Sequence, residues 1–171
     1  EGELRIAGRT TSARDRAQGD IAMVHQELAV FPNMSVAENI FVGRLPRKGG
    51  RIDFARMHSR TRELLSLFGL TLDPREILGQ LTPGQQQISE ILRAVESNAS
   101  LLILDETTSG LNNVEAETLV SLVKRLRDSG HTILYVSHRL HEVLDIADHI
   151  TVLRDGEFIG TLKNEGLSED D

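Results

Sequence analysis

Residues 101–106, Leu-Leu-Ile-Leu-Asp-Glu, decide the fold class, because a run of four apolar residues is followed at once by two carboxylates. A continuous apolar run of this length is typical of a strand in a parallel sheet that is covered on both faces. Asp105 and Glu106 are therefore expected at the carboxyl edge of the sheet, where open α/β folds bind their ligands. Two adjacent carboxylates at such an edge indicate a cation, and Mg²⁺ with a nucleotide phosphate suits hard oxygen ligands.

The segment before this strand predicts an amphipathic helix that opens on a turn. The turn is Leu-Thr-Pro-Gly-Gln at residues 81–85, and Pro suits a first helical turn, where its missing N–H has no intrahelical partner to lose. Four apolar residues between Ile88 and Val95 then share one helical face. Thr82 offers a hydroxyl and Gly84 an unobstructed N–H, so together with the helix N-terminus they predict an anion site.

Two further predicted strands end in polar side chains. Residues 21–25 precede Gln26, whose amide has both donor and acceptor groups and can contact a cation and water together. Residues 132–137 precede His138. The alternative for each side chain is an ordinary surface residue. The alternation of strands and helices along the chain predicts the α/β class.

In this order the four segments resemble ATP-binding cassette (ABC) ATPases. Residues 81–87 resemble the signature motif of that family, and residues 101–106 resemble its Walker B strand. Gln26 and His138 match the Q-loop glutamine and the switch histidine. Three segments are most similar to one branch of the family, the first cassette of tandem-cassette importers for simple sugars of the ribose, galactose and xylose type. These segments are residues 24–28, 36–41 and 137–140.

The resemblance implies a role for each matching residue. Asp105 would hold Mg²⁺ through its water shell, and Gln26 would contact both Mg²⁺ and the attacking water. Glu106 would orient or polarise that water, while His138 would donate a hydrogen bond to the γ-phosphate. ATP and Mg²⁺ are thus the implied cofactors. The signature-motif residues that would bind, in trans, the nucleotide of an opposite cassette are Leu81, Thr82, Gly84 and Gln85.

The phosphate-cradling loop of the family, Gly-x-x-x-x-Gly-Lys-Ser/Thr, occurs nowhere in the 171 residues. The chain is therefore expected to be an N-terminally truncated segment of a larger ATPase of the P-loop type, inactive alone. One partial domain is expected, with a mostly parallel sheet and flanking helices. Its parts are an α/β core (residues 1–29 and 96–162), a helical subdomain with the signature motif (residues 30–95) and a loose tail (residues 163–171).

Local patterns predict further elements. Residues 12–18 are expected as a brief helix, and residues 43–50, with Pro46 and two glycines, as an exposed connector. Asp155-Gly156 is expected at the turn of an antiparallel hairpin. Two capping boxes and one N-cap mark helix starts: Ser35 with Glu38, Asn112 with Glu115, and Asp53.

Composition limits the partners. A net charge of −7 argues against a nucleic-acid surface, and the absence of cysteine excludes disulfide and thiolate chemistry. No apolar run approaches the ~20 residues that span a bilayer, so a partner would have to provide any membrane anchor. The resemblance implies a second cassette and membrane permease subunits as partners at the cytoplasmic face of the membrane, with no nucleic acid and no direct sugar contact.

The implied function is that of an ATP-binding and hydrolysing subunit segment that energises a carbohydrate ABC importer. Two alternatives stay open. The first is a non-catalytic cassette remnant with a structural or regulatory role, which the absent phosphate loop favours. The second is a soluble ABC ATPase without a link to transport, acting in DNA repair or translation. The acidic charge and the short helix predicted after Asp53 disfavour the DNA-repair form of this alternative. The sequence does not name the sugar, whose contacts belong to other subunits.

Overall fold

The computed structural model describes residues 4–6, 9–11 and 21–168. The helix predicted over residues 12–18 lies outside the described residues. Near the start, β1 (Leu4–Ile6) pairs antiparallel with β2 (Arg9–Thr11), a strand that the sequence analysis did not predict. None of the helices in the described part of the chain is long and apolar enough to cross a membrane.

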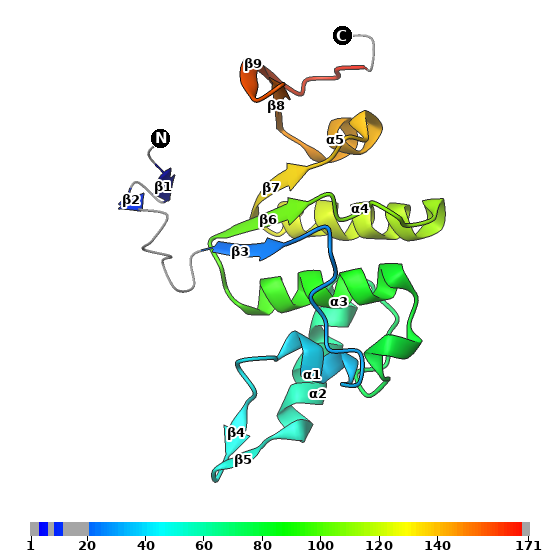
Figure 1. Ribbon diagram of the computed structural model, residues 1–171. Helices are drawn as coiled ribbons and strands as arrows, with labels where there is room; N and C mark the ends of the chain where they lie inside the picture. Colours follow the sequence, from blue (N-terminus) through cyan, green and yellow to red (C-terminus); the bar gives the residue numbers. More distant parts are fainter. Residues whose placement is uncertain (1–3, 7–8, 12–20, 169–171) are drawn as a thin grey trace.

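A three-stranded parallel sheet lies at the centre of the fold (Figure 1). Its strands are β3 (Ile21–Val24), β6 (Leu101–Asp105) and β7 (Thr132–Val136), with β6 in the middle. The register pairs Val24 with Leu104 and Asp105 with Val136, so the three strands end close to one another. The predicted α/β fold with a parallel sheet is confirmed.

The two faces of the sheet differ in burial. On one face Leu102 and Leu104 are fully buried in a core that includes residues of α3 (Pro83–Glu96) and α4 (Asn113–Asp128). On the other face Leu101 and Ile103 are only half-buried. The expectation that residues 101–104 are covered on both faces is therefore wrong for the described residues. Successive side chains of a strand point to opposite faces, and the described helices cover one of them.

The helical part of the chain follows β3. It contains α1 (Val36–Ile40), α2 (Phe54–Leu67), the short 3₁₀ helix η1 (Leu78–Gln80) and α3, and α1 packs on both α2 and α3. The exposed connector predicted over residues 43–50 contains a strand, β4 (Arg47–Lys48). This strand pairs antiparallel with β5 (Arg51–Ile52) in a small hairpin. Its turn falls on two glycines, which accept the left-handed backbone that the turn requires.

The predicted helix starts are confirmed by hydrogen bonds. Ser35 Oγ accepts from the N–H of Glu38 at 3.3 Å, and Glu38 Oε2 accepts from the N–H of Ser35 at 2.9 Å. Asn112 and Glu115 form the same reciprocal pair before α4. Asp53 accepts from the third residue of α2. Each cap satisfies N–H groups that the first turn of a helix leaves unpaired.

The chain continues from β7 into α5 (Leu140–Ile146), β8 (His149–Arg154) and β9 (Glu157–Lys163). The predicted hairpin is confirmed, and both of its turn residues have positive φ. The tail was expected to be loose, but Asn164 Nδ2 donates to the carbonyls of Leu144 and Ala147, each at 2.7 Å. Asn164 thus satisfies carbonyls at the end of α5.

Candidate functional site

The turn after β6 fixes the position of the Glu106 carboxylate. Glu106 has φ = 48°, in the left-handed region that non-glycine residues avoid. Its N–H donates to the carbonyl of Val136 at 2.9 Å, and its own carbonyl accepts from the N–H of Ser109 at 3.0 Å. A strained backbone that is held on both sides is a frequent feature of functional turns.

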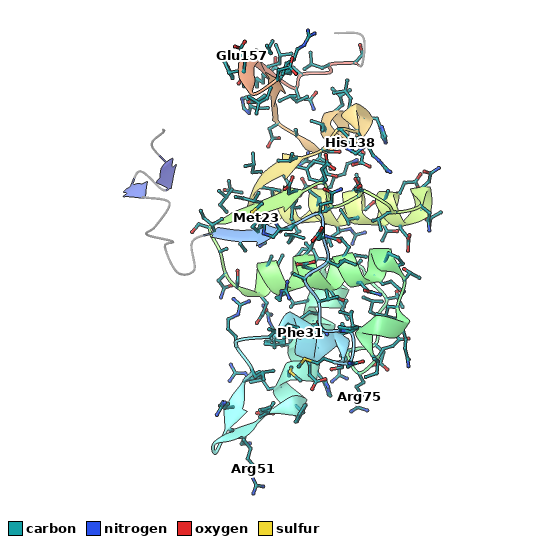
Figure 2. All side chains as sticks on the ribbon, in the orientation of Figure 1. Met23, Phe31, Arg51, Arg75, His138 and Glu157 are labelled. Atoms are coloured by element: carbon teal, nitrogen blue, oxygen red, sulfur yellow. The ribbon has the colours of Figure 1, made fainter. Side chains whose placement is uncertain are left out.

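Glu106 and His138 meet at the carboxyl edge of the sheet. The Nδ1 atom of His138 lies 3.2 Å from Oε1 of Glu106, and the two side chains are 64% and 32% exposed respectively. Because a carboxylate only accepts hydrogen bonds, Nδ1 carries the proton in this contact. In the neutral ring Nε2 is then an acceptor, and in the imidazolium it donates. Figure 2 shows His138 beyond the end of β7.

Gln26 reaches the same edge from the loop after β3. Its Nε2 atom donates to Ser109 Oγ at 3.5 Å, a long contact across 83 residues of sequence. The contact uses the amide nitrogen, so the amide oxygen is the atom of Gln26 that suits a cation. The register and the contacts of the strands are consistent with the prediction that four side chains meet at one sheet edge, namely Gln26, Asp105, Glu106 and His138.

The donor set at this edge fits a hard cation that keeps water or ligand oxygens. Asp105 offers a carboxylate and Gln26 an amide oxygen, the ligand types that Mg²⁺ takes from proteins. In the described part of the chain no three His, Cys, Asp or Glu side chains gather as a metal site. A cation at this edge would therefore take most of its ligands from water and phosphate oxygens.

The loop that follows Gln26 is clamped to α3. The N–H of Ala29 donates to Glu90 Oε2 at 3.3 Å, and its carbonyl accepts from Arg93 Nη1 at 2.7 Å. Arg93 and Glu90 also form an ion pair at 2.8 Å. Burial raises the pKa of the Glu90 carboxyl, although Arg93 and the Ala29 N–H oppose this. The position of the loop thus depends on the position of α3.

The signature-motif residues lie at the start of α3, as predicted. Thr82 is the N-cap: its Oγ1 accepts from the N–H of Gln85 at 3.4 Å, and Gln85 Oε1 accepts from the N–H of Thr82 at 3.0 Å. The carbonyl of Leu81 accepts from Gln86 Nε2 at 2.9 Å. The Gln85 side chain therefore stabilises the helix start in this structure.

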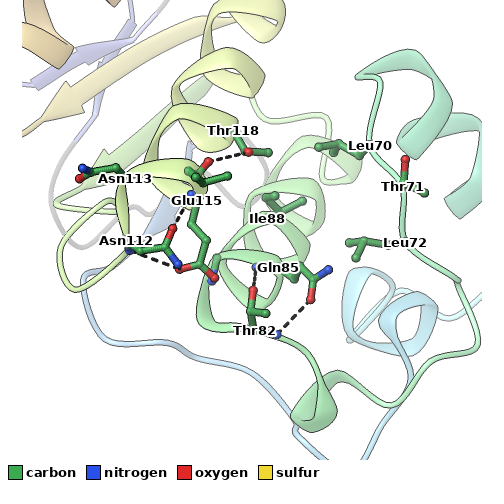
Figure 3. A pocket seen from close by; sticks show the side chains of 12 residues that line it. Leu70, Thr71, Leu72, Thr82, Gln85, Ile88, Asn112, Asn113, Glu115 and Thr118 are labelled. Atoms are coloured by element: carbon green, nitrogen blue, oxygen red, sulfur yellow. Dashed lines mark hydrogen bonds between the residues drawn. The ribbon is translucent and has the colours of Figure 1, made fainter.

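A carboxylate of the chain itself occupies part of the predicted anion site. Gly84 N–H donates to Glu115 Oε1 at 3.3 Å. Figure 3 shows the Glu115 side chain near Thr82 and Gln85. A Cβ at position 84 would approach Glu115 carbon atoms to 2.8–3.0 Å, so only glycine leaves room for this contact. The Thr82 hydroxyl, and then the N–H groups of Asn112 and Gly84, lower the pKa of Glu115 against the opposing effect of burial.

A cleft of about 680 Å³ opens beside this contact. It lies between the starts of α3 and α4 and residues 70–72, and three of the signature-motif residues line it: Thr82, Gly84 and Gln85. No hydrogen bond among the described residues joins this cleft to the Glu106–His138 pair. The structure therefore arranges the predicted site residues in two groups, one at the sheet edge and one at the start of α3.

Comparison with known proteins agrees with the motif order and the fold. The model of the ABC transporter family matches residues 1–109. The chain belongs to the ABC transporter family. This ABC chain also resembles the dimeric, post-hydrolysis structure of the ATP-binding cassette MJ0796 bound to ADP and Pi, with a TM-score of 0.76 and 25% identity; the likeness covers 98% of this chain and 75% of that one.

Curated relatives of this ABC chain are import proteins for sugars. The ribose import ATP-binding protein RbsA 2 of Mesorhizobium japonicum is 45% identical over 159 residues, which are 91% of this chain and 31% of that protein. The arabinose import ATP-binding protein AraG of Vibrio parahaemolyticus is 42% identical over 164 residues, 94% of this chain and 32% of that protein. The chain spans about a third of the length of these relatives.

Sequence reasoning missed three carboxylates of this ABC chain: Glu115, which contacts Gly84, and Glu90 and Glu142, which bind segments next to the sheet-edge group. Glu90 carried little signal, because it lies two positions after Ile88 and so on the side of the helix away from the predicted apolar face. Glu115 was interpreted only as a helix cap. Glu142 carried little signal beyond its position four residues after His138.

Proposed function

We propose that this chain is part of the ATP-hydrolysing subunit that energises a carbohydrate ABC importer. The contact between Glu106 and His138 at the edge of the parallel sheet carries the hydrolytic part of the proposal. The relatives named for ribose and arabinose import support the transport part. Because the chain spans about a third of those relatives, the activity is proposed for the complete subunit.

Each residue at the sheet edge has a proposed role. When bound, MgATP supplies the phosphoanhydride whose terminal phosphoryl group is transferred to water. Asp105 holds the water shell of the metal, and Gln26 contacts the metal and the attacking water through its amide. Glu106 accepts a hydrogen bond from that water and orients it. His138 holds the Glu106 carboxylate through Nδ1–H and, as the imidazolium, donates from Nε2 to a phosphate oxygen.

The start of α3 serves a second cassette in this proposal. The Thr82 hydroxyl and the Gly84 N–H bind the phosphates of a nucleotide held by the facing cassette, with Leu81 and Gln85 shaping the loop. The separation of the two residue groups within this chain supports such an arrangement, since one group completes a site on another cassette. The dimeric state named for the MJ0796 structure is consistent with it.

We further propose that residues 1–29, 30–95 and 96–162 act as one domain.

The loop before α1 is the surface that we propose for a membrane permease subunit. Residues 36–41 also resemble the surface that receives the permease in this family, but the side chains of Val36, Ala37 and Ile40 are buried. Phe31, in contrast, is 48% exposed, and its backbone is held by the side chain of Asn39 at 2.8 and 2.9 Å. A fixed, exposed aromatic ring suits a partner's pocket. The subunit would then lie peripherally at the cytoplasmic face of the membrane.

Replacement of the proposed catalytic carboxylate tests the hydrolytic proposal. In the complete subunit, Glu106→Gln keeps the side-chain size and removes the charge that orients water, so ATPase activity should fall roughly 100-fold or more. ATP affinity should change by less than about tenfold, because Asp105 remains. Glu117→Gln, on the exposed side of α4, is the matched control. A Glu106→Gln variant that hydrolyses ATP at the parent rate would refute the assignment.

The non-catalytic alternative has one observation in its favour, the absence of Gly-x-x-x-x-Gly-Lys-Ser/Thr from the 171 residues. It predicts that the complete subunit releases no phosphate from MgATP in the presence of its permease. Glu106-dependent phosphate release would exclude it.

A further inference from the structure

Glu142 is a deeply buried carboxylate that the proposed mechanism does not use. It lies in α5 and is only 3% exposed. A buried charge of this kind is stable only with hydrogen-bond donors around it. Burial alone would raise the pKa of Glu142, but hydrogen bonds from Thr108, Tyr135 and Arg139 lower it overall. The group is therefore an acceptor-only carboxylate at neutral pH.

Three hydroxyl groups converge on one oxygen of this carboxylate. Glu142 Oε2 accepts from Thr108 Oγ1 at 2.7 Å, from the Tyr135 hydroxyl at 2.8 Å and, more weakly, from Ser137 Oγ at 3.4 Å. The other oxygen accepts from Arg139 Nη1 at 3.2 Å. Burial and the hydrogen bond to Glu142 raise the pKa of the Tyr135 phenol, so it stays a donor.

These donors come from the two segments that carry the proposed catalytic pair. Thr108 lies two residues after Glu106, in the turn that follows β6. Ser137 and Arg139 lie directly before and after His138, and Ser137 Oγ also accepts from the Arg139 N–H at 3.0 Å. One buried carboxylate thus joins the Glu106 turn to the His138 turn.

The catalytic pair itself is too exposed to hold this geometry. The contact between Glu106 and His138 is open to water, and exposed ion pairs of this kind contribute little to stability. Its 3.2 Å separation therefore depends on how firmly the two turns are joined beneath it. Hydrogen bonds to a buried carboxylate are stronger and less dynamic than those at the surface.

Resting on the proposed hydrolysis at Glu106 and His138, we propose that Glu142 is a positioning residue that fixes the distance between these two side chains. Its side chain is buried beneath the proposed site and is not assigned any contact with the nucleotide. Its ionised carboxylate joins the turn of Thr108 to the turn of Ser137 and Arg139. Loss of that carboxylate should lower kcat and leave KM for MgATP almost unchanged.

A double-mutant cycle in the complete subunit separates positioning from a merely structural role. Glu142→Gln should lower kcat about tenfold or more, because small misplacements of catalytic groups are costly. In the His138→Ala background the same change should lower kcat by less than about twofold, since the residue it positions is absent. An equal fall in both backgrounds would overturn the proposal.

A milder pair of variants covers the case in which Glu142→Gln fails to fold. Thr108→Val removes one donor to the carboxylate at constant shape, and Thr108→Ser restores the hydroxyl. The valine variant should show the kcat defect and the serine variant should recover most of it. Glu117→Gln is the surface control for the loss of one negative charge. A valine variant with the parent kcat would contradict the proposal.

A readout without turnover distinguishes this inference from the proposed function. In histidine-labelled protein without nucleotide, Glu106→Gln should shift the NMR signal of the His138 ring, because the ring loses its carboxylate acceptor. In a Glu142→Gln protein that shift should be much smaller, since the pair is already apart. An undiminished shift would refute the positioning role even if the subunit hydrolyses ATP. Absence of ATPase activity in the parent would count against the proposed function alone.

Discussion

The N–H of Gly84 donates to Oε1 of Glu115 at 3.3 Å, although 31 residues separate them. The contact places a negative charge against donors that, in the proposed function, bind the phosphates of a facing nucleotide. Glu115 is also the third residue of α4 and the acidic member of its capping box. The same carboxylate therefore stabilises a helix start and, in the proposed function, would compete with an incoming phosphate.

Removal of the Glu115 charge should favour nucleotide-driven association. Glu115→Gln keeps a capping-box acceptor, since Gln serves as well as Glu at this position. In complete subunits that also carry Glu106→Gln to stop turnover, dimerisation with MgATP should strengthen roughly two- to fivefold, the range for an exposed charge interaction. Analytical ultracentrifugation measures it, with Glu117→Gln as the control. Unchanged or weaker dimerisation would show that Glu115 does not compete with nucleotide.

Thr82 should contribute to stability as well as to phosphate binding. Thr82→Ala removes the side-chain acceptor at the start of α3 and should lower the free energy of unfolding by about 0.5–2 kcal/mol. Thr82→Ser keeps the acceptor and should remain within about 0.5 kcal/mol of the parent. Urea denaturation followed by circular dichroism measures both. Equal stability of the alanine and serine variants would contradict the capping role.

The capping box before α1 predicts a pH-dependent effect. The Ser35 side chain, and then its backbone N–H, lower the pKa of Glu38 below the ordinary 4.5. Its contribution to stability is therefore complete above the unfolded pKa and is lost as the pH falls through the lower folded pKa. Ser35→Ala removes the larger cause, so its stability deficit should shrink between pH 7 and strongly acidic pH. A deficit that stays constant in denaturant titrations across this range would be evidence against the effect.

The clamp on Ala29 predicts the opposite pH dependence. The pKa of Glu90 is raised by burial, so the stability associated with its protonated form is present below 4.5 and is lost as the pH rises through the folded pKa. Arg93→Met removes the charge that mainly opposes the raised pKa of Glu90. The stability lost as the pH rises should therefore be larger in this variant than in the parent. Arg93→Met with Glu90→Gln should recover much of it, because no charge is then left buried. Denaturation curves at pH 4 and pH 8 measure both variants.

The 171-residue chain alone should bind MgATP poorly and show no turnover. The loop whose backbone N–H groups and Lys cradle phosphates in this family is absent from it, and the sheet edge alone offers few phosphate donors. Isothermal titration calorimetry measures the affinity, and a phosphate-release assay measures the turnover. Micromolar affinity would contradict this expectation.

Features set by a few neighbouring residues could be predicted from the sequence. The capping boxes at Ser35 and Asn112 depend on spacings of three residues, and the structure has both. The ends of β6 at Asp105 and of β7 at Val136, two residues before His138, follow from where apolar runs stop. These patterns are local, so a single sequence is enough to identify them.

Features that depend on distant partners could not be predicted. The apolar run from Leu101 to Leu104 says that the strand is buried but not which face is covered. Glu142 gains its donors from residues up to 34 positions away, and none of them marks it in the sequence. The contact of Glu115 with Gly84 likewise arises only when α3 and α4 pack side by side.

The clamp on Ala29 gives α3 a mechanical consequence. This helix has 14 residues and is about 21 Å long. The signature-motif residues lie at its start, and Glu90 and Arg93, further along the helix, bind the backbone of the loop after Gln26. A helix of this length tilts as a rigid lever and does not stretch. In the proposed dimer, a tilt of α3 imposed at Thr82 by a facing cassette would therefore displace the loop after Gln26, and nucleotide at one site would change the geometry of the other.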